Sequence, residues 1–286
     1  MAVLNKVLFN RIVCGVLSLV LMFSVAGTVL VLNSLGPKGS DEPAIILNQP
    51  SSLNKINVLV LGADAGLLPG GIKAATRTDT IMVVSYDQVT KVVNVLSLPR
   101  DSRVIIPGKA NLDKITHAHV YGGVALSIKT VELLLDIPIH YYIRGDSSGF
   151  RQVVDAIGGV EYEVEADMFY EDPYQDLYIN LKKGLQLLNG SKAEQYVRYR
   201  NDSDIYRIAR QQKFLVATFK TLLKPINLLR IDDIVRIGFN SVFTNIGVGD
   251  IIKHLGNLSS MNAGNVSWHT APGKSLLVNG GWYWVL

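Results

Sequence analysis

Arginine and aspartate residues recur near the ends of the expected strands and helices. The arginines are Arg77, Arg100, Arg198, Arg200, Arg207 and Arg210, and Asp64, Asp79 and Asp101 accompany three of the same ends. Planar guanidinium groups can grip phosphate oxygens in pairs, and carboxylates can hold a hard divalent cation that bridges those oxygens. The two residue types together indicate a pyrophosphate site. The sequence has neither a Walker loop nor a Gly-x-Gly-x-x-Gly motif, which argues against a nucleotide-binding enzyme of those classes.

Each of these residues also has a structural explanation. Asp101 beside Arg100 could be a helix N-cap or an exposed ion pair worth about 0–1 kcal/mol. Arg207 and Arg210 could lie on a solvated helix face, and Asp64 could be a turn residue. The functional interpretation gains weight because several elements are expected to turn their arginines toward one region, where unscreened like charges repel unless an anion lies between them.

A β-hairpin is expected to bring two of the clusters together. Residues 80–85 and 91–97 are rich in β-branched side chains, and the polar stretch 86–90 between them is typical of a turn. Folded about the bond between Gln88 and Val89, the hairpin places Arg77 across from Arg100, with Asp79 one step inward. A slip of one residue would reverse the faces.

Two further elements are expected to supply the remaining cations. Residues 191–194 fit a capping box for a short helix after Gly190 that ends near Tyr196. If residues 196–200 are extended, Arg198 and Arg200 share one face. The long helix expected over residues 205–223 carries Arg207, Arg210 and Gln211 at the spacing that places side chains on one face of a helix.

Residues 169–176 are interpreted as a surface loop, and alternating strands and helices over residues 55–286 indicate one α/β domain.

The N-terminal region predicts a membrane anchor. Residues 12–32 form an uncharged 21-residue stretch, and Lys6 and Arg11 precede it. This length spans about 30 Å of hydrocarbon, and the positive charges predict a cytoplasmic N-terminus over residues 1–11. Residues 33–54 are rich in Gly, Pro and Ser and read as an extracellular linker. A cleaved signal peptide is the alternative, although the apolar run exceeds the usual length.

The single cysteine, Cys14, excludes an intramolecular disulfide, and the mild net charge of +4 predicts no nucleic-acid-binding face.

Seven short stretches carry a specific resemblance. Residues 61–64, 77–80, 97–102, 114–123, 154–160, 196–200 and 210–212 resemble, in that order, the motifs of the LytR-CpsA-Psr (LCP) family. The similarity runs from about residue 57 to residue 223. It implies an α/β fold with a mixed central β-sheet flanked by helices, preceded by one transmembrane helix, with a hydrophobic tunnel for a lipid tail.

The resemblance also implies roles for the charged residues. Asp64 and Asp79 match aspartates associated with Mg²⁺, and Asp101 matches an aspartate expected to orient Arg100 or to help deprotonate the acceptor. The expected pyrophosphate-binding residues are Arg77, Arg100, Arg198, Arg200, Arg207, Arg210 and Gln211. Tyr206 stands where the family often has glycine, so the direction of Arg207 is left open. His117 and His119 could act as bases or pack in the core, and packing is favoured.

The implied activity is a magnesium-dependent glycopolymer phosphotransfer. A sugar hydroxyl of the cell-wall peptidoglycan attacks the phosphorus that bears the glycan in a polyprenyl pyrophosphate donor, and polyprenyl phosphate leaves. Pyrophosphatase activity is a conceivable side reaction. The expected partners are the polyprenyl lipid, the wall glycan and the membrane, with the catalytic domain outside the cell. The alternatives are a non-catalytic membrane-tethered protein that binds the lipid or glycan, and an envelope-related transcriptional attenuator.

Overall fold

The computed structural model describes residues 54–63, 77–172, 177–199, 204–222, 224–247 and 265–286. The expected membrane helix over residues 12–32 and the linker that follows it lie outside the described residues, as do Asp64 and Arg200. The expectations for these segments therefore stay predictions.

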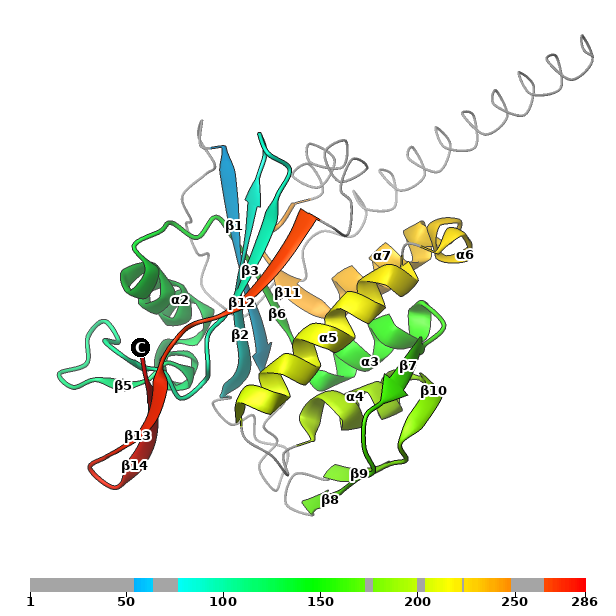
Figure 1. The fold of residues 1–286 in the computed structure, drawn as a ribbon. Helices are drawn as coiled ribbons and strands as arrows, with labels where there is room; N and C mark the ends of the chain where they lie inside the picture. The colour runs from blue at the N-terminus through cyan, green and yellow to red at the C-terminus, as the bar shows by residue number, and fades with distance from the viewer. Residues whose placement is uncertain (1–53, 64–76, 173–176, 200–203, 223, 248–264) are drawn as a thin grey trace, which may run out of the picture.

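A six-stranded mixed sheet forms the centre of the fold, in the order β11-β6-β1-β2-β3-β12 (Figure 1). Its strands are β1 (Lys55–Ala63), β2 (Thr78–Asp87), β3 (Val93–Ser97), β6 (Tyr141–Gly145), β11 (Val242–Thr244) and β12 (Val266–Thr270). Strand β1 pairs antiparallel with β2 and parallel with β6, and β12 runs parallel to β3. The mixed central sheet predicted from the sequence is confirmed.

Helices cover both faces of this sheet, because successive side chains in its strands point to opposite sides. Helix α2 (Thr116–Leu135) covers one face, and α3 (Ser147–Ala156) and α5 (Asp204–Leu222) cover the other (Figure 1). Leu59 of β1 belongs to the buried cluster that contains Ile128 of α2. Val60, its neighbour, belongs instead to the cluster that contains Met82 and Leu215.

Helix α2 is apolar and long enough to cross a membrane, the one such helix in the described part of the chain. Its side chains Ala118, Val124, Ile128 and Val131 are nevertheless buried in the core against the sheet. Non-helical backbone at Gly122 and Gly123 also kinks it. This helix is therefore a core element of the domain.

The second lobe surrounds α3 and α5. It contains α4 (Gly190–Arg198), α6 (Pro225–Leu228), α7 (Ile231–Asn240) and two hairpins, β7 (Val160–Val164) with β10 (Gly184–Leu188) and β8 (Met168–Asp172) with β9 (Leu177–Leu181). Tyr196 and Phe214 are fully buried in its core. The prediction of a loop over residues 169–176 was wrong for its first half, because Met168 is buried and β8 pairs along β9.

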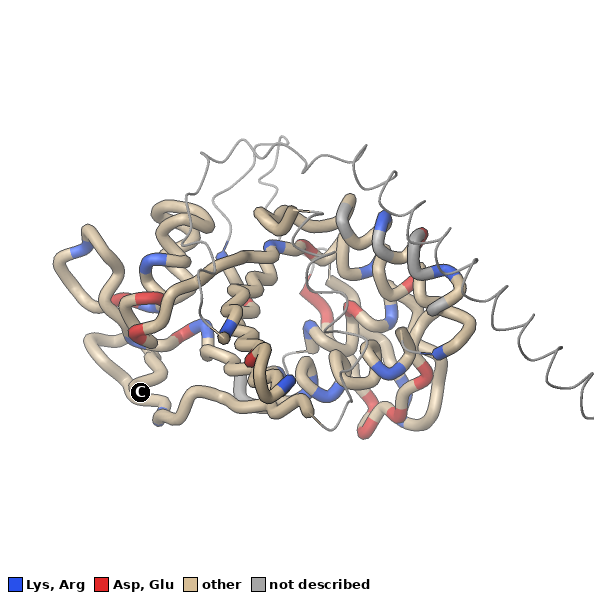
Figure 2. The backbone as a smooth tube through the Cα atoms, turned by 90° about the horizontal axis from the view of Figure 1, so that it is seen from above, with Lys and Arg blue, Asp and Glu red and all other residues tan. Residues whose placement is uncertain are grey.

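Small hairpins occupy the α2 side of the sheet. They are β4 (Arg103–Val104) with β5 (Asp113–Lys114) and the C-terminal pair β13 (Lys274–Val278) with β14 (Gly281–Val285). The backbone N–H of Trp284 donates to the carbonyl oxygen of Asp101 at 2.8 Å, which ties β14 to the loop after β3. Figure 2, seen from above, shows this group and the second lobe on opposite sides of the central strands.

The β2–β3 hairpin has a different register from the predicted one. Met82 pairs with Ser97 and Tyr86 with Val93, so the chain reverses between residues 89 and 90. The Asp87 carboxylate accepts the backbone N–H groups of Val89 and Thr90, which builds a longer turn. Asp79, rather than Arg77, therefore comes to lie across from Arg100. Because the partner of each residue moves by two positions, every side chain still points to the face of the sheet that was predicted for it.

Candidate functional site

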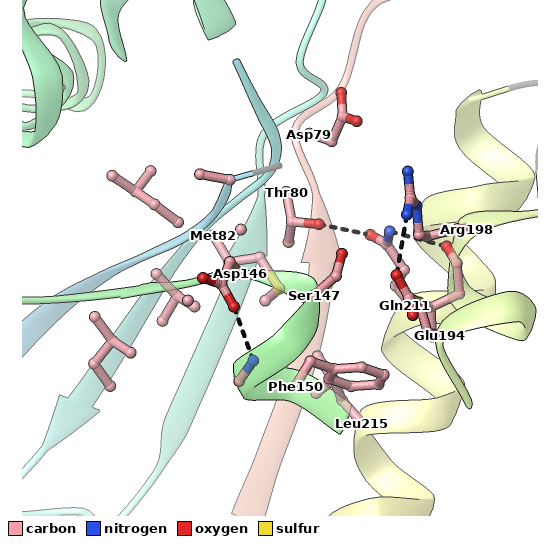
Figure 3. A pocket seen from close by; sticks show the side chains of 18 of the residues that line it. Asp79, Thr80, Met82, Asp146, Ser147, Phe150, Glu194, Arg198, Gln211 and Leu215 are labelled. Carbon is pink, nitrogen blue, oxygen red and sulfur yellow. Dashed lines mark hydrogen bonds and ion pairs between the residues drawn. The ribbon is translucent and has the colours of Figure 1, made fainter. Parts of the chain in front are cut away.

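A cavity of about 360 Å³ lies between the sheet and helices α3 and α5. Most of its lining is apolar and includes Val60, Met82, Phe150, Val153, Phe214 and Leu215. Polar lining residues come from β2, α4 and α5 and from the start of α3: Asp79, Thr80, Glu194, Arg198, Arg207, Gln211, Asp146 and Ser147. Figure 3 shows Thr80, Gln211, Arg198 and Glu194 together on one side of the cavity, with Phe150 and Leu215 farther along it. The site therefore joins an apolar chamber to a group of charged side chains.

Asp79 and Arg100 form an ion pair at the base of the β2–β3 hairpin. Nη1 of Arg100 lies 2.6 Å from Oδ1 of Asp79, and both side chains are partly exposed. Arg207 is 4% exposed and lines the cavity, and its Nη2 lies 3.5 Å from the backbone oxygen of Asp79. The direction of Arg207, left open in the sequence, is toward the cavity despite the adjacent Tyr206.

Gln211 links the sheet to both neighbouring helices. The Thr80 hydroxyl donates to Oε1 of Gln211 at 3.3 Å, and Nε2 of Gln211 donates to the carbonyl oxygen of Val197 at 3.3 Å. These bonds connect β2, α5 and the end of α4 across the polar part of the lining. Gln211, chosen from the sequence, is therefore placed in the site.

Arg198 is the last residue of a helix, so the predicted extended segment from residue 196 was wrong at this point. Helix α4 continues because Glu194 pairs with Arg198 at the (i, i+4) spacing, with Oε1 and Nη1 separated by 3.0 Å. The other oxygen of Glu194 accepts from Nη1 of Arg151 on α3 at 2.9 Å. Asn189 caps the helix by accepting the N–H of Lys192, so the predicted capping box is not the one used.

Glu194 is a site residue that the sequence reasoning missed. It lines the cavity, is 8% exposed, and holds two guanidinium groups through separate oxygens. Its position four residues before Arg198 was the available signal. The sequence analysis did not predict this pair, because it expected the helix to end near Tyr196, before Arg198.

Asp146 caps the first turn of α3 beside the cavity, where its carboxylate accepts the N–H of Gly149 at 2.8 Å (Figure 3). Gly149 lies so close to α7 that an added Cβ would be 2.2 Å from the backbone oxygen of Ser241. Only glycine fits this approach, which fixes how α3 borders the cavity.

Three further predicted site residues within the described ranges, Arg77, Asp101 and Arg210, are not part of the cavity lining. Nη2 of Arg210 donates to the carbonyl oxygen of Tyr199 at 2.6 Å, and the guanidinium lies over the Tyr199 ring. Arg77 is exposed just before β2. Asp101 pairs with Nζ of Lys114 at 2.7 Å and lies 3.9 Å from Nε of Arg100. The Asp101 carboxylate therefore lies between Lys114 and Arg100.

The two histidines of α2 differ in their surroundings. His119 is buried, as the packing interpretation predicted. His117 is half-buried, and its Nδ1 lies 2.8 Å from Oδ1 of Asp113, a partner that the sequence did not reveal. Burial raises the pKa of Asp113, but hydrogen bonds from the Tyr121 hydroxyl, the Lys114 amide and His117 outweigh it and hold that pKa below its ordinary value. The same bond to Asp113 raises the pKa of Tyr121.

The charged side chains suit a Mg²⁺ ion that is shared with a substrate. Within the described ranges, no three His, Cys, Asp or Glu side chains cluster as a metal cage. Mg²⁺ commonly binds through only one or two carboxylates plus substrate phosphates, so one aspartate at a phosphate site is sufficient. Asp79 meets this requirement at the cavity, and Asp64 follows directly on Ala63, which pairs with Thr78. The residue types therefore fit the ion.

Several proteins of similar sequence are named as teichoic acid transferases. The chain is 36% identical over 202 residues to the polyisoprenyl-teichoic acid–peptidoglycan teichoic acid transferase TagT of Bacillus subtilis (strain 168). The aligned region covers 70% of this chain and 62% of TagT. The chain is 29% identical over 293 residues to a TagU of Oceanobacillus iheyensis, covering 95% of this chain and 88% of that protein. The match thus spans less than two thirds of the length of TagT.

Solved structures of similar fold include other proteins of the same kind, TagV and TagT. B. subtilis TagV superimposes with a TM-score of 0.69 at 29% identity, covering 82% of this chain and 92% of that one. A TagT structure with bound octaprenyl pyrophosphate superimposes with a TM-score of 0.63 at 27% identity, covering 87% and 91%. The model of the LytR_cpsA_psr family matches residues 23–286. With this match over most of its length, the chain belongs to the LytR-CpsA-Psr family.

Proposed function

We propose that this chain is a phosphotransferase that moves a glycopolymer phosphate from a polyprenyl pyrophosphate donor to a sugar hydroxyl of peptidoglycan and releases polyprenyl phosphate. The observation that carries the proposal is the apolar cavity whose lining also contains Arg198, Arg207 and Asp79. An apolar chamber beside clustered guanidinium groups matches a ligand with a hydrocarbon tail and an anionic head. The names of TagT and TagU, and the octaprenyl pyrophosphate bound by TagT, support the same substrate class.

The lipid tail would occupy the space between the sheet and helices α3 and α5, which serves as the tunnel in this proposal. Apolar surface removed from water stabilises the complex by about 25 cal/mol per Å². Met82, Phe150 and Leu215 offer such surface from three different elements. The tail would therefore supply most of the affinity and hold the head group beside Asp79.

The pyrophosphate would lie among Arg100, which follows β3, Arg198 of α4 and Arg207 of α5. Arg198 and Arg207 line the cavity, Arg100 reaches the site through its pair with Asp79, and Gln211 adds a polar contact. Guanidinium groups suit this task because they bind phosphate oxygens in pairs. The proposed set is completed by Arg77, Arg200 and Arg210.

Catalysis would consist mainly of positioning and charge neutralisation. The acceptor hydroxyl attacks the glycan-bearing phosphorus, a new P–O bond forms, and the bond to the bridging oxygen breaks. Negative charge that develops on the departing polyprenyl phosphate is stabilised by the arginines. Asp101 is the proposed acceptor of the hydroxyl proton or the group that orients Arg100. A Mg²⁺ ion held by Asp64 and Asp79 would supply further positive charge at the pyrophosphate oxygens.

The proposed location is the outer face of the cell membrane. Residues 12–32 would span the bilayer with residues 1–11 in the cytoplasm, so the domain over residues 55–286 would face the wall. The donor carries its own activated pyrophosphate bond, so the reaction needs no nucleotide outside the cell.

The test uses full-length protein in detergent, a polyprenyl pyrophosphoryl disaccharide and a peptidoglycan oligosaccharide. We expect magnesium-dependent release of polyprenyl phosphate that falls about 100-fold or more in Arg100→Ala and Asp79→Ala, the cost typical of losing a charge-stabilising group. Arg236→Ala is the control, because Arg236 lies exposed on α7 and pairs with Asp233. Undiminished turnover in both site variants would refute the assignment. Tight donor binding by the wild-type protein without turnover would support a non-catalytic lipid-binding role instead.

A further inference from the structure

Three cations and two tyrosines form a surface on the α2 side of the sheet, which we call the cation–aromatic surface. It consists of Arg103, Lys109, Lys114, Tyr121 and Tyr283. The residues come from the β4–β5 hairpin and its loop, the second turn of α2, and β14. Figure 1 shows these elements on the side of the sheet opposite to α3 and α5, which border the cavity.

The cations are held against the aromatic rings. Nζ of Lys109 lies 3.9 Å from the centre of the Tyr121 ring, and Tyr121 is 46% exposed. Nζ of Lys114 and the guanidinium carbon of Arg103 lie 5.5 Å and 5.9 Å from the centre of the Tyr283 ring. Such contacts stabilise a cation in place at little cost to its exposure. Lys109 and Tyr121 are exposed, whereas Arg103, Lys114 and Tyr283 are half-buried, so the cations are held in place on a surface that is partly open to solvent.

Positive charge is in excess here. Asp101 neutralises Lys114 at 2.7 Å, and Asp113 accepts from His117 and Tyr121. Among the described residues, the contacts of Arg103 and Lys109 are to tyrosine rings and not to carboxylates. Three cations against the carboxylates of Asp101 and Asp113, beside the exposed Tyr121 ring and the half-buried Tyr283 ring, favour a ligand that has both negative charge and apolar C–H faces.

A continuous chain of contacts joins this surface to the candidate site. Lys114 pairs with Asp101, Asp101 lies 3.9 Å from Arg100, and Arg100 pairs with Asp79 at the cavity. The N–H of Thr116, at the start of α2, also donates to the carbonyl oxygen of Arg100 at 3.2 Å. The cation–aromatic surface thus begins where the charged part of the site ends, on the side away from the cavity.

We propose that the cation–aromatic surface binds the first anionic repeat units of the glycopolymer that the donor carries. The inference rests on the proposed function. With the lipid tail in the cavity and the pyrophosphate at Arg198 and Arg207, the polymer leaves the site on the opposite side and passes over β5 and β14. Its phosphodiesters meet Arg103 and Lys109, while its sugar or polyol C–H groups contact the Tyr121 and Tyr283 rings.

The experiment compares two donors with the full-length protein in detergent. One is a polyprenyl pyrophosphoryl disaccharide, and the other is the same lipid extended by several glycerol phosphate units. The test variants are Arg103→Gln and Lys109→Gln. Lys182→Gln is the matched control, because Lys182 also lies over an aromatic ring, that of Phe169, at 4.4 Å in the other lobe.

We expect the double variant, Arg103→Gln with Lys109→Gln, to raise KM for the extended donor about tenfold and to leave KM for the short donor unchanged. A tenfold change corresponds to a loss of about 1.4 kcal/mol in binding free energy. High salt should reduce the difference between wild type and variant, because exposed charges are screened. Arg103→Lys should retain most of the affinity. Equal effects on both donors, or none, would overturn the inference. A rise in KM for the peptidoglycan acceptor alone would also overturn it and assign the surface to the acceptor strand.

Failure of the proposed function is distinguishable from failure of this inference. If the wild-type protein turns over neither donor, the transfer reaction is refuted. Equilibrium binding of the two lipids to wild-type and variant protein still decides the inference, because only the extended lipid should lose affinity. Thermal unfolding of each variant establishes that the fold is intact.

Discussion

Replacing Glu194 with glutamine tests whether this buried carboxylate holds Arg198 at the cavity. Glutamine keeps the size and one hydrogen-bonding oxygen but removes the negative charge. The bond to Arg198 joins side chains that are 11% and 17% exposed, and such charge-assisted bonds contribute about 1.5–3 kcal/mol. Arg151 is 46% exposed, so its pair with Glu194 contributes about 0–1 kcal/mol. Together these two contributions give an expected loss in unfolding free energy of about 1.5–4 kcal/mol.

The same substitution should weaken donor binding. Without the carboxylate, Arg198 can swing away from the lining, and a shift worth about 1.4 kcal/mol raises KM for the lipid donor about tenfold. Urea unfolding monitored by circular dichroism measures the stability, and initial rates over a range of donor concentrations measure KM.

Asp233→Asn is the matched control for this prediction. Asp233 pairs with Arg236 at 3.0 Å within α7, but the side chains are 58% and 50% exposed. The cost should therefore be about 0–0.5 kcal/mol with an unchanged KM. A Glu194→Gln protein as stable as Asp233→Asn, with wild-type KM, would refute the argument that buried charge pairing positions Arg198.

Three further outcomes follow from the fold. Leu215→Trp should fill part of the cavity and weaken lipid binding at least tenfold, measured by displacement of a fluorescent polyprenyl phosphate; unchanged affinity would place the tail elsewhere. Gly149→Ala should lower the unfolding free energy by about 1–3 kcal/mol, since the new Cβ meets the Ser241 backbone oxygen, and an unchanged urea midpoint would contradict that contact. His140 accepts the Asn57 N–H, and burial lowers the pKa of this histidine below its ordinary value of 6.5. The contribution of neutral His140 to stability is therefore present above pH 6.5 and is lost as the pH falls toward the pKa of the folded state, because the unfolded state binds the proton first. His140→Gln should flatten that dependence between pH 8 and pH 5; an equally steep slope would assign the dependence to other groups.

The sequence predicted the elements near the site better than their ends. Strands over residues 80–85 and 91–97 were confirmed because their β-branched side chains fit a buried sheet. Their register was wrong because the Asp87 side chain caps the turn and Lys91 adopts a positive φ, details that a count of turn residues does not capture. Helix α4 runs to Arg198 because Glu194 is also anchored by Arg151, a residue 43 positions earlier in the chain.

By itself, the sequence determined the chemistry available to this protein: arginines and aspartates at element ends, apolar strands to support them, and motifs of one family. Only the tertiary structure decided which of those side chains share the site. Thr80 and Gln211 meet across 131 positions, Arg207 turns to the cavity, and Arg210 turns to Tyr199. The physical reason is that residue type and local periodicity set what a side chain can bind, whereas its direction depends on packing contacts with distant parts of the chain.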